Sequence, residues 1–247
     1  MMPGKAYTEE HEVVYYETNV TGHLNIGNLV DLCMLVSTDQ SRKLGISTEK
    51  LDEMGYGWIV TQNIIDIKRL PVDHEKIKIT TVAKSYNRYF CYRDFYMQDE
   101  NDEEIVHMHT VFSLMDKSKR KIARIKEEIV GPYEGDYTTK LERLETPTQI
   151  KHIDFNKKYR VRFTDIDSNQ HVNNIHYFEW MLDTLPKDFL MTHEVKHLNV
   201  MYKNEVRYGE VVDSNTQLLE DEQKTHHEIK VSDKISCIAD VQWQAIK

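Results

Sequence analysis

The sequence predicts an α+β protein made of two successive copies of one unit, in which an antiparallel sheet curls around a central helix. Three observations predict it: a repeated segment, one strongly apolar helix pattern in each copy, and alternating strand patterns after each helix. The repeat pairs YYETNVTGHLNIGNLVDL (15–32) with FTDIDSNQHVNNIHYFEW (163–180), an offset of 148 residues (171 − 23) that aligns His23 with His171. Because a repeat decides the architecture before any single motif does, we expect two domains of one fold.

Each copy contains one helix pattern with the 3.6-residue period. In the first copy the apolar positions are Ile26, Leu29, Val30, Cys33 and Val36. Gly45 follows as a suitable C-terminal end. In the second copy the apolar positions are Ile175, Phe178, Leu182 and Leu185. Aromatic neighbours leave this second helix little polar surface, so we expect the strands that follow to wrap around it.

Alternating apolar and polar residues predict half-buried strands at 105–114 (IVHMHTVFSL) and 235–244 (ISCIADVQWQ). Between the two copies, residues 131–156 hold two glycines and two prolines and show no sustained period, as a linker does. We therefore expect an N-terminal domain at residues 1–130, a linker at 131–156 and a C-terminal domain at 157–247.

Composition limits the class of protein. The chain has 247 residues, a formal net charge of -9 and 40% hydrophobic residues, which is typical of a soluble globular protein and argues against nucleic acid as a partner. No run approaches the roughly 18 apolar residues of a membrane helix, and the first residues lack a signal-peptide pattern. The separated Cys33, Cys91 and Cys237 fit buried thiols in a reducing compartment. We expect a cytoplasmic protein without a membrane partner.

Polar side chains crowd the start of the second helix. They are Asp165, Asp167, Asn169, His171, Asn173 and Asn174. Any one of them could simply cap the helix, but a cap uses only one or two side chains. Burying each of the others unpaired would cost roughly 1–3 kcal/mol. The whole cluster therefore predicts a functional site.

Two segments resemble metal-binding motifs but do not meet the requirements of those motifs. A calcium loop beginning at Asp165 would need glycine and glutamate where Gln170 and His176 stand. HEVKH (193–197) matches a zinc motif only if it is helical, whereas the residues after it are typical of a strand, in which its histidines would lie about 13 Å apart. We expect neither a metal nor a cofactor.

The cluster suits acyl transfer to water. A histidine is the commonest general base, a carboxylate can orient it, and the N–H groups of the first helical turn can stabilise an oxyanion. A base contributes about 10²–10⁴ in rate and an oxyanion donor about 3–4 kcal/mol, which is sufficient for an activated ester or thioester. A serine hydrolase has no support, because the chain lacks a G-x-S-x-G motif.

The segment DIDSNQHVNNIHYFEWML resembles the active-site region of the acyl-acyl carrier protein thioesterases, in their bacterial rather than plastid form. Further similar segments run in the family's order through nearly the whole chain, including GYGWIV, IKRLP, YRDFYMQD and LNVMYKNEV. The resemblance implies two tandem hotdog domains and hydrolysis of acyl-acyl carrier protein to free fatty acid, with acyl carrier protein as partner. The short motif is also similar to single-hotdog acyl-CoA thioesterases, and only the doubled length favours the carrier protein.

Position by position, the resemblance places catalytic roles on Asp167, Asn169, His171 and Glu205. Plant members continue the glutamate with a cysteine, where this chain has Val206. We therefore expect water to attack the thioester, with the choice of base among Asp167, His171 and Glu205 left open. The competing interpretation is that Glu205 is an exposed carboxylate on an edge strand and has no catalytic role.

His23 lacks these companions, because Asn19 and Thr21 occupy the positions that correspond to Asp167 and Asn169. We predict that His23 is catalytically silent. Chemistry would then belong to the second half, and the first half would hold the acyl chain, as the resemblance implies.

The predicted substrate-binding residues are Asn173, Asn174, Leu29, Leu32, Val36 and Trp58. Core packing is the competing explanation of the apolar ones. An acidic enzyme needs a local basic patch to bind an acidic carrier, and we predict Lys119, Arg120 and Lys121 for this docking. A solvated turn would carry the same charges. A homodimer of two-domain chains is possible. An acyl-CoA thioesterase, a hotdog dehydratase and a non-catalytic acyl-binding module are the competing functions.

Overall fold

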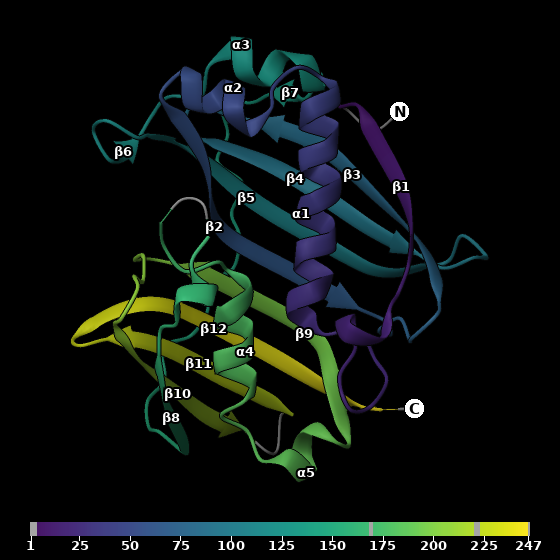
Figure 1. The fold of residues 1–247 in the computed structure, drawn as a ribbon, viewed down its shortest axis with the longest axis vertical. Helices are drawn as coiled ribbons and strands as arrows, with labels where there is room; N and C mark the ends of the chain where they lie inside the picture. Colours follow the sequence, from purple (N-terminus) through teal and green to yellow (C-terminus); the bar gives the residue numbers. More distant parts are fainter. Residues whose placement is uncertain (1–3, 168–169, 220–222, 247) are drawn as a thin grey trace.

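The fold was obtained as a computed structural model and is described for residues 4–167, 170–219 and 223–246. It contains one sheet of twelve strands with helices α1 and α4 on the same face, one over each half (Figure 1). The helices are α1 (Ile26–Lys43), α2 (Thr48–Glu53), α3 (Glu127–Val130), α4 (Ile175–Leu182) and α5 (Lys187–Leu190), with 3-10 turns η1 (Tyr15–Glu17), η2 (Gly131–Tyr133) and η3 (Phe163–Asp165).

In each half one strand precedes the central helix and the other strands follow it. In the first half the strands are β1 (Ala6–Glu12), β2 (Tyr56–Ile67), β3 (Lys76–Tyr86), β4 (Phe90–Gln98), β5 (Glu104–Asp116), β6 (Lys121–Ile122) and β7 (Asp136–Tyr137). In the second half they are β8 (Phe155–Arg160), β9 (His193–Tyr202), β10 (Val211–Leu219), β11 (Lys224–Val231) and β12 (Lys234–Ala245). The order across the sheet is β1-β3-β4-β5-β2-β9-β12-β11-β10-β8, with β6 on β5 and β7 on β3. Apart from the short parallel pair β3–β7, every pairing is antiparallel.

This arrangement confirms the predicted fold class of two tandem hotdog domains. Strands β2 and β9 join the two halves into one sheet, with Ile64 opposite Asn199 in the register. Gln62 and Asn199 both donate a side-chain hydrogen bond to the carbonyl of Glu145, at 2.8 and 2.9 Å, so the segment between the halves is tied across this junction. The domain limits at residues 130 and 157 stay a prediction.

One of the two central helices ends where its pattern predicts, and the other ends earlier. α1 ends where predicted, because Gly45 adopts a φ of 77° and its N–H donates to the carbonyl of Arg42. α4 ends at Leu182, earlier than the apolar period to Leu185 implied. The chain turns there because the hydroxyl of Thr184 bonds the carbonyl of Met181 and Pro186 cannot continue the helix.

The core of the protein lies between the sheet and the two helices. Its main apolar cluster takes residues from both halves, among them Leu29 and Leu32 of α1 and Phe178 and Met181 of α4. A smaller cluster lies under α2 and α3. The continuous core holds α1 and α4 against each other, which places the start of α4 beside the first half of the chain.

Candidate active site

The segment before α4 is held by Asp165, which is buried. Its carboxylate accepts hydrogen bonds from the backbone and side chain of Arg162 at 2.8 and 2.9 Å, and its carbonyl accepts from Asn173 N–H at 2.9 Å. Burial alone would raise the pKa of Asp165, but the Arg162 hydrogen bonds lower it below its ordinary value. Asp165 is thus an anchor for the loop rather than a free base.

A tight turn brings Asp167 and His171 together. The N–H of Asp167 donates to the carbonyl of His171 at 3.0 Å, and Gln170 closes the turn with a φ of 68°. Oδ1 of Asp167 lies 3.9 Å from Nδ1 of His171, and the two side chains are 26% and 27% exposed. This distance suits an electrostatic contact or a shared water better than a direct hydrogen bond. Asn169 lies outside the described residues.

The first half repeats this turn with different side chains. Asn19 N–H donates to the carbonyl of His23 at 2.9 Å, and Gly22, the counterpart of Gln170, has a φ of 79°. The polar groups bond to one another: Thr21 donates to the Asn19 side chain and its hydroxyl meets Nδ1 of His23 at 2.9 Å. Because Asn19 replaces a carboxylate, this turn offers His23 no charged partner of the Asp167 kind.

Glu205 reaches the same region from the end of β9. Val206 accepts a backbone hydrogen bond from Val172 N–H at 2.9 Å, which ties the strand exit to the residue after His171. The Glu205 carboxylate accepts a hydrogen bond from Nη2 of Arg120 at 2.5 Å. Arg120 belongs to the β5–β6 hairpin of the first half, so a residue predicted for docking contacts a residue predicted for catalysis. Sequence reasoning missed this contact because nothing local links positions 85 residues apart.

A cavity of about 360 Å³ lies between the two halves. The second half contributes Asp167, Asn173, Asn174 and Ile175. The first half contributes residues of α1, α2, β2 and β5, which include Val30, Asp31, Met34, Ser37, Trp58, Asn63 and Phe112. The predicted polar site therefore opens directly into space walled by the other half.

The start of α4 offers fewer free N–H groups than expected. Ile175 N–H donates to the Asn173 side chain at 3.3 Å, and His176 and Tyr177 donate to the carbonyls of Asn173 and Asn174. Among the described residues, the backbone N–H of Asn174 has no acceptor. It is the remaining candidate for an oxyanion donor, together with the two asparagine amides.

Of the predicted acyl-binding residues of the first half, one is among the residues that line the cavity between the two halves. It is Trp58, whereas Leu29, Leu32 and Val36 are buried in the main core cluster. The face of α1 that lines the cavity carries Val30, Asp31, Met34, Ser37, Thr38 and Ser41. Sequence reasoning ranked α1 by apolarity, and apolarity marks the core-facing side rather than a partly polar cavity wall.

A second, smaller cavity of about 60 Å³ extends into the first half. It shares Ser37, Ser41, Trp58 and Phe112 with the larger one, and its other lining residues include Arg93 and Tyr133. The buried Arg93 donates to Gln40 and Thr81 at 2.6 and 2.9 Å, and burial lowers its pKa to about 10. The two spaces therefore share part of their walls, and both are lined by residues of the first half.

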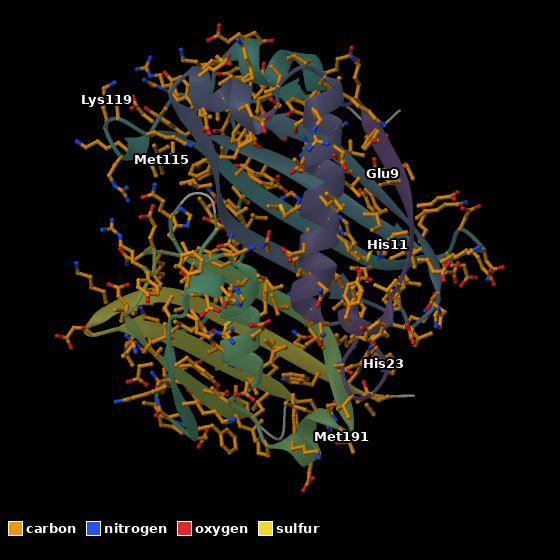
Figure 2. All side chains as sticks on the ribbon, in the orientation of Figure 1. Glu9, His11, His23, Met115, Lys119 and Met191 are labelled. Carbon is orange, nitrogen blue, oxygen red and sulfur yellow. The ribbon has the colours of Figure 1, made fainter. Side chains whose placement is uncertain are left out.

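The remaining predicted groups are placed as follows. Lys119 binds Asp116 at 2.9 Å, and Lys121 lies exposed in β6. Figure 2 shows Lys119 and His23 on opposite sides of the molecule. No group of three or more metal-ligating side chains occurs within the described part of the chain. HEVKH begins β9, as the strand pattern predicted. No helix in the described ranges is long and apolar enough to cross a membrane.

Comparison with known proteins identifies the fold and the family of the chain. The chain is 38% identical to a putative oleoyl thioesterase from Lactobacillus plantarum, with a TM-score of 0.95 over 99% of this chain and 98% of that one. An acyl-ACP thioesterase from Bacteroides thetaiotaomicron, 22% identical over 97% of this chain and 98% of its own, shares the fold with a TM-score of 0.85.

A chloroplastic oleoyl-acyl carrier protein thioesterase from Coriandrum sativum is 25% identical over 235 residues, which are 86% of this chain and 63% of that protein. The chain thus spans less than two thirds of this relative. The family models for the acyl-ACP thioesterase N-terminal and C-terminal domains match residues 4–133 and 148–245. The chain belongs to the acyl-ACP thioesterase family.

Proposed function

We propose that this protein hydrolyses the thioester of an acyl-acyl carrier protein to free fatty acid and carrier protein, which terminates fatty acid synthesis. The observation that carries the proposal is the opening of the Asp167–His171 turn into a cavity walled by the other half of the chain. Family membership supports the reaction class, and the doubled fold supports a carrier-bound rather than a CoA-bound acyl group.

The proposed reaction adds water to the thioester carbonyl. A base among Asp167, His171 and Glu205 takes a proton from the water, and the water oxygen bonds to the carbonyl carbon. The C–S bond then breaks, and the protonated base gives its proton to the leaving sulfur, which yields the carboxylic acid and the carrier thiol. The Asn174 N–H and the amides of Asn173 and Asn174 would bind the carbonyl oxygen as its negative charge develops. A catalytic role for Asn169 is proposed because its segment resembles the active-site segment of the family. The proposal needs no cofactor.

The proposed acyl path runs from Asp167 past Trp58 and Phe112 toward Arg93 and Tyr133. Trp58 and Phe112 pack edge to face with ring centroids 6.2 Å apart and line both cavities. Walls that combine apolar and polar side chains would favour chains of a certain length, because each methylene buried against the apolar part is worth about 0.8 kcal/mol. We propose that Met34, Ser37 and Trp58 set this length rather than the core residues Leu32 and Val36.

We propose that the carrier protein docks at the β5–β6 hairpin, with Lys119, Arg120 and Lys121 as contacts. The hairpin lies beside Glu205, so a carrier bound there would hold its thioester near the site. Ion pairs already engage Lys119 and Arg120 within the chain, which leaves Lys121 as the strongest candidate. A homodimer and a cytoplasmic location stay proposals.

The test is hydrolysis of a ladder of acyl-carrier thioesters and of the same acyl groups on CoA, followed as free thiol. We expect faster release from the carrier at one or a few chain lengths. A preference for CoA at every length would instead support the acyl-CoA thioesterase. Release from neither donor by folded protein would contradict hydrolysis and leave an acyl-binding module.

A further inference from the structure

We propose that Arg120 of the first half is a positioning residue for the Glu205 carboxylate of the second, so that the active site is completed by a contact between the two halves. The inference rests on the proposed hydrolysis. It goes beyond it by giving Arg120 a role in the chemical step, separate from carrier docking.

The backbone around Glu205 is fixed, but its side chain is not. Lys203 and Asn204 N–H donate to the carbonyl of Ser236 at 2.8 and 3.2 Å, and the adjacent Val206 is fully buried. The Glu205 carboxylate is 35% exposed and accepts one hydrogen bond from the described residues, that of Arg120. Holding a glutamate side chain in one rotamer costs up to about 1.5–2 kcal/mol of conformational entropy, so without a bonding partner the side chain would sample several rotamers. Arg120 is therefore what holds this carboxylate in place.

Arg120 lies in a turn that is closed by side-chain hydrogen bonds. The Asp116 carboxylate accepts from the Ser118 hydroxyl at 2.7 Å and from Lys119 N–H at 2.9 Å, and Lys117 pairs with Asp52 of α2. Arg120 has a φ of 50°, a left-handed conformation that a non-glycine residue adopts at some cost. The turn presents the guanidinium to Glu205 in a defined direction.

The contact uses one carboxylate oxygen and leaves the other available. Nη2 of Arg120 lies 2.5 Å from Oε2 of Glu205, and Nη2 of Arg207 lies 3.9 Å from the same oxygen. No residue of the described chain donates a hydrogen bond to Oε1. A charge-assisted bond to Oε2 would thus orient Oε1 toward a water or toward the His171 segment, to which the Val172–Val206 hydrogen bond ties this strand end.

A positioning role and a docking role for Arg120 predict different kinetics. If Arg120 orients Glu205, its loss should lower kcat on every thioester, including those without a carrier protein. If Arg120 only binds the carrier, its loss should raise KM for carrier-bound substrate and leave other thioesters unchanged. The two roles can therefore be separated with a pair of substrates.

The experiment compares Arg120→Gly, Arg120→Lys, Glu205→Gln and the double variant Arg120→Gly/Glu205→Gln with the unaltered chain. Glycine suits the positive φ at position 120, so this variant removes the side chain without straining the turn. Arg88→Ala is the control, because Arg88 is an exposed arginine whose side chain packs against Tyr89 in the β3–β4 turn. Each protein is assayed on one acyl-carrier thioester and on the same acyl-CoA.

We expect Arg120→Gly to lower kcat about 10–100-fold on both donors, with KM for the acyl-CoA little changed, as misplacement of a catalytic group does. Guanidinium ion, at a concentration well below that which unfolds the protein, should restore part of the rate, and sodium chloride at equal ionic strength should not. Arg120→Lys should keep an intermediate rate, because a lysine ammonium offers a charge without the planar fork. The double variant should be no slower than Glu205→Gln, since both changes remove one function.

Three results would overturn the positioning role. They are a rise in KM for the carrier substrate with kcat unchanged on both donors, losses that multiply in the double variant, and a loss of kcat that guanidinium cannot restore. If the unaltered chain hydrolyses no thioester, the proposed function itself fails. The free energies of unfolding of the unaltered chain, Arg120→Gly, Glu205→Gln and the double variant then still test the contact. Additive effects of the two substitutions would show that Arg120 and Glu205 do not interact.

Discussion

A Cβ atom added at Gly27 of α1 would lie 2.4 Å from Cγ1 of Ile175, the first residue of α4. Real Cβ contacts are longer, so the two helices approach at this point only because residue 27 has no side chain. Ile175 follows directly on Asn173 and Asn174, which line the larger cavity with it. The spacing of the helices and the placement of the proposed substrate-binding amides are therefore set by one glycine.

Gly27→Ala should destabilise the protein even though alanine is the better helix former. The helix propensity gained is about 1 kcal/mol, whereas overpacking a close contact costs typically 1–3 kcal/mol. We expect a lower free energy of unfolding in urea, together with slower thioester hydrolysis because α4 must shift. Adding Ile175→Ala should restore part of both losses. A Gly27→Ala protein as stable as the unaltered chain would show that the helices move apart without cost.

The two corresponding histidines should respond differently to removal. His171→Ala should lower kcat by about 10²–10⁴, the range for loss of a positioned acid–base group. His23→Ala should leave kcat unchanged, because the first-half turn has Asn19 in place of a carboxylate. Parallel assays of both variants on one acyl-carrier substrate provide the comparison. Equal losses of kcat in the two variants would mean that both histidines contribute to catalysis.

Chain-length preference should follow the cavity wall rather than the core. Ser37→Leu adds three carbons where the two cavities meet, so we expect the product profile to shift toward shorter acids. Leu32→Phe should overpack the core and lower stability by about 1–3 kcal/mol without changing the profile. Chromatography of the released acids and urea unfolding measure the two effects. A profile that moves with Leu32→Phe alone would place the acyl chain on the other face of α1.

Charge reversal on the β5–β6 hairpin tests docking. Lys121→Glu should raise KM for carrier-bound substrate and spare the same acyl-CoA, since an acidic carrier would meet a negative charge. Raising the salt concentration should reduce the difference. Lys50→Glu on α2 is a control of equal charge change, and it should behave like the unaltered chain. Equal effects of Lys121→Glu on both donors would contradict docking at this hairpin.

Acid stability should depend on the buried His227. Both ring nitrogens meet threonine hydroxyls, Thr216 at 2.9 Å and Thr225 at 2.7 Å, and burial lowers the pKa from 6.5 to about 3. Below its ordinary pKa the unfolded chain binds a proton that the folded chain does not. The stabilising contribution is therefore complete above about pH 6.5 and is lost as the pH falls toward 3, by up to about 1.4 kcal/mol per pH unit.

His227→Gln should remove this slope while keeping the hydrogen-bonding character of the side chain. Unfolding of both proteins in urea between about pH 5 and 6.5 isolates the effect, because ordinary carboxylates stay ionised there. His107 and His176 also titrate, with pKa values raised by the nearby carboxylates of Asp94 and Glu179, but they do so in both proteins and cancel in the comparison. Parallel pH curves for the two proteins would show that His227 titrates normally.

The sequence by itself determined the doubled architecture, the strand identity of HEVKH and the position of the polar turn. These follow from local patterns: a repeat at a fixed offset, alternation along β5 and β12, and polar residues crowded before α4. Each depends on neighbours in the chain, for which periodicity and turn chemistry are sufficient.

Only the tertiary structure decided which side chains meet across the molecule. It placed Leu32 and Val36 in the core and Ser37 on the cavity wall. The reason is that the way the sheet curves around α1 determines which face of the helix packs against the strands. It also placed Arg120 on Glu205, a contact between hairpin and strand ends that are distant in sequence. Such contacts depend on the packing of two complete halves, and no local pattern of residues encodes that geometry.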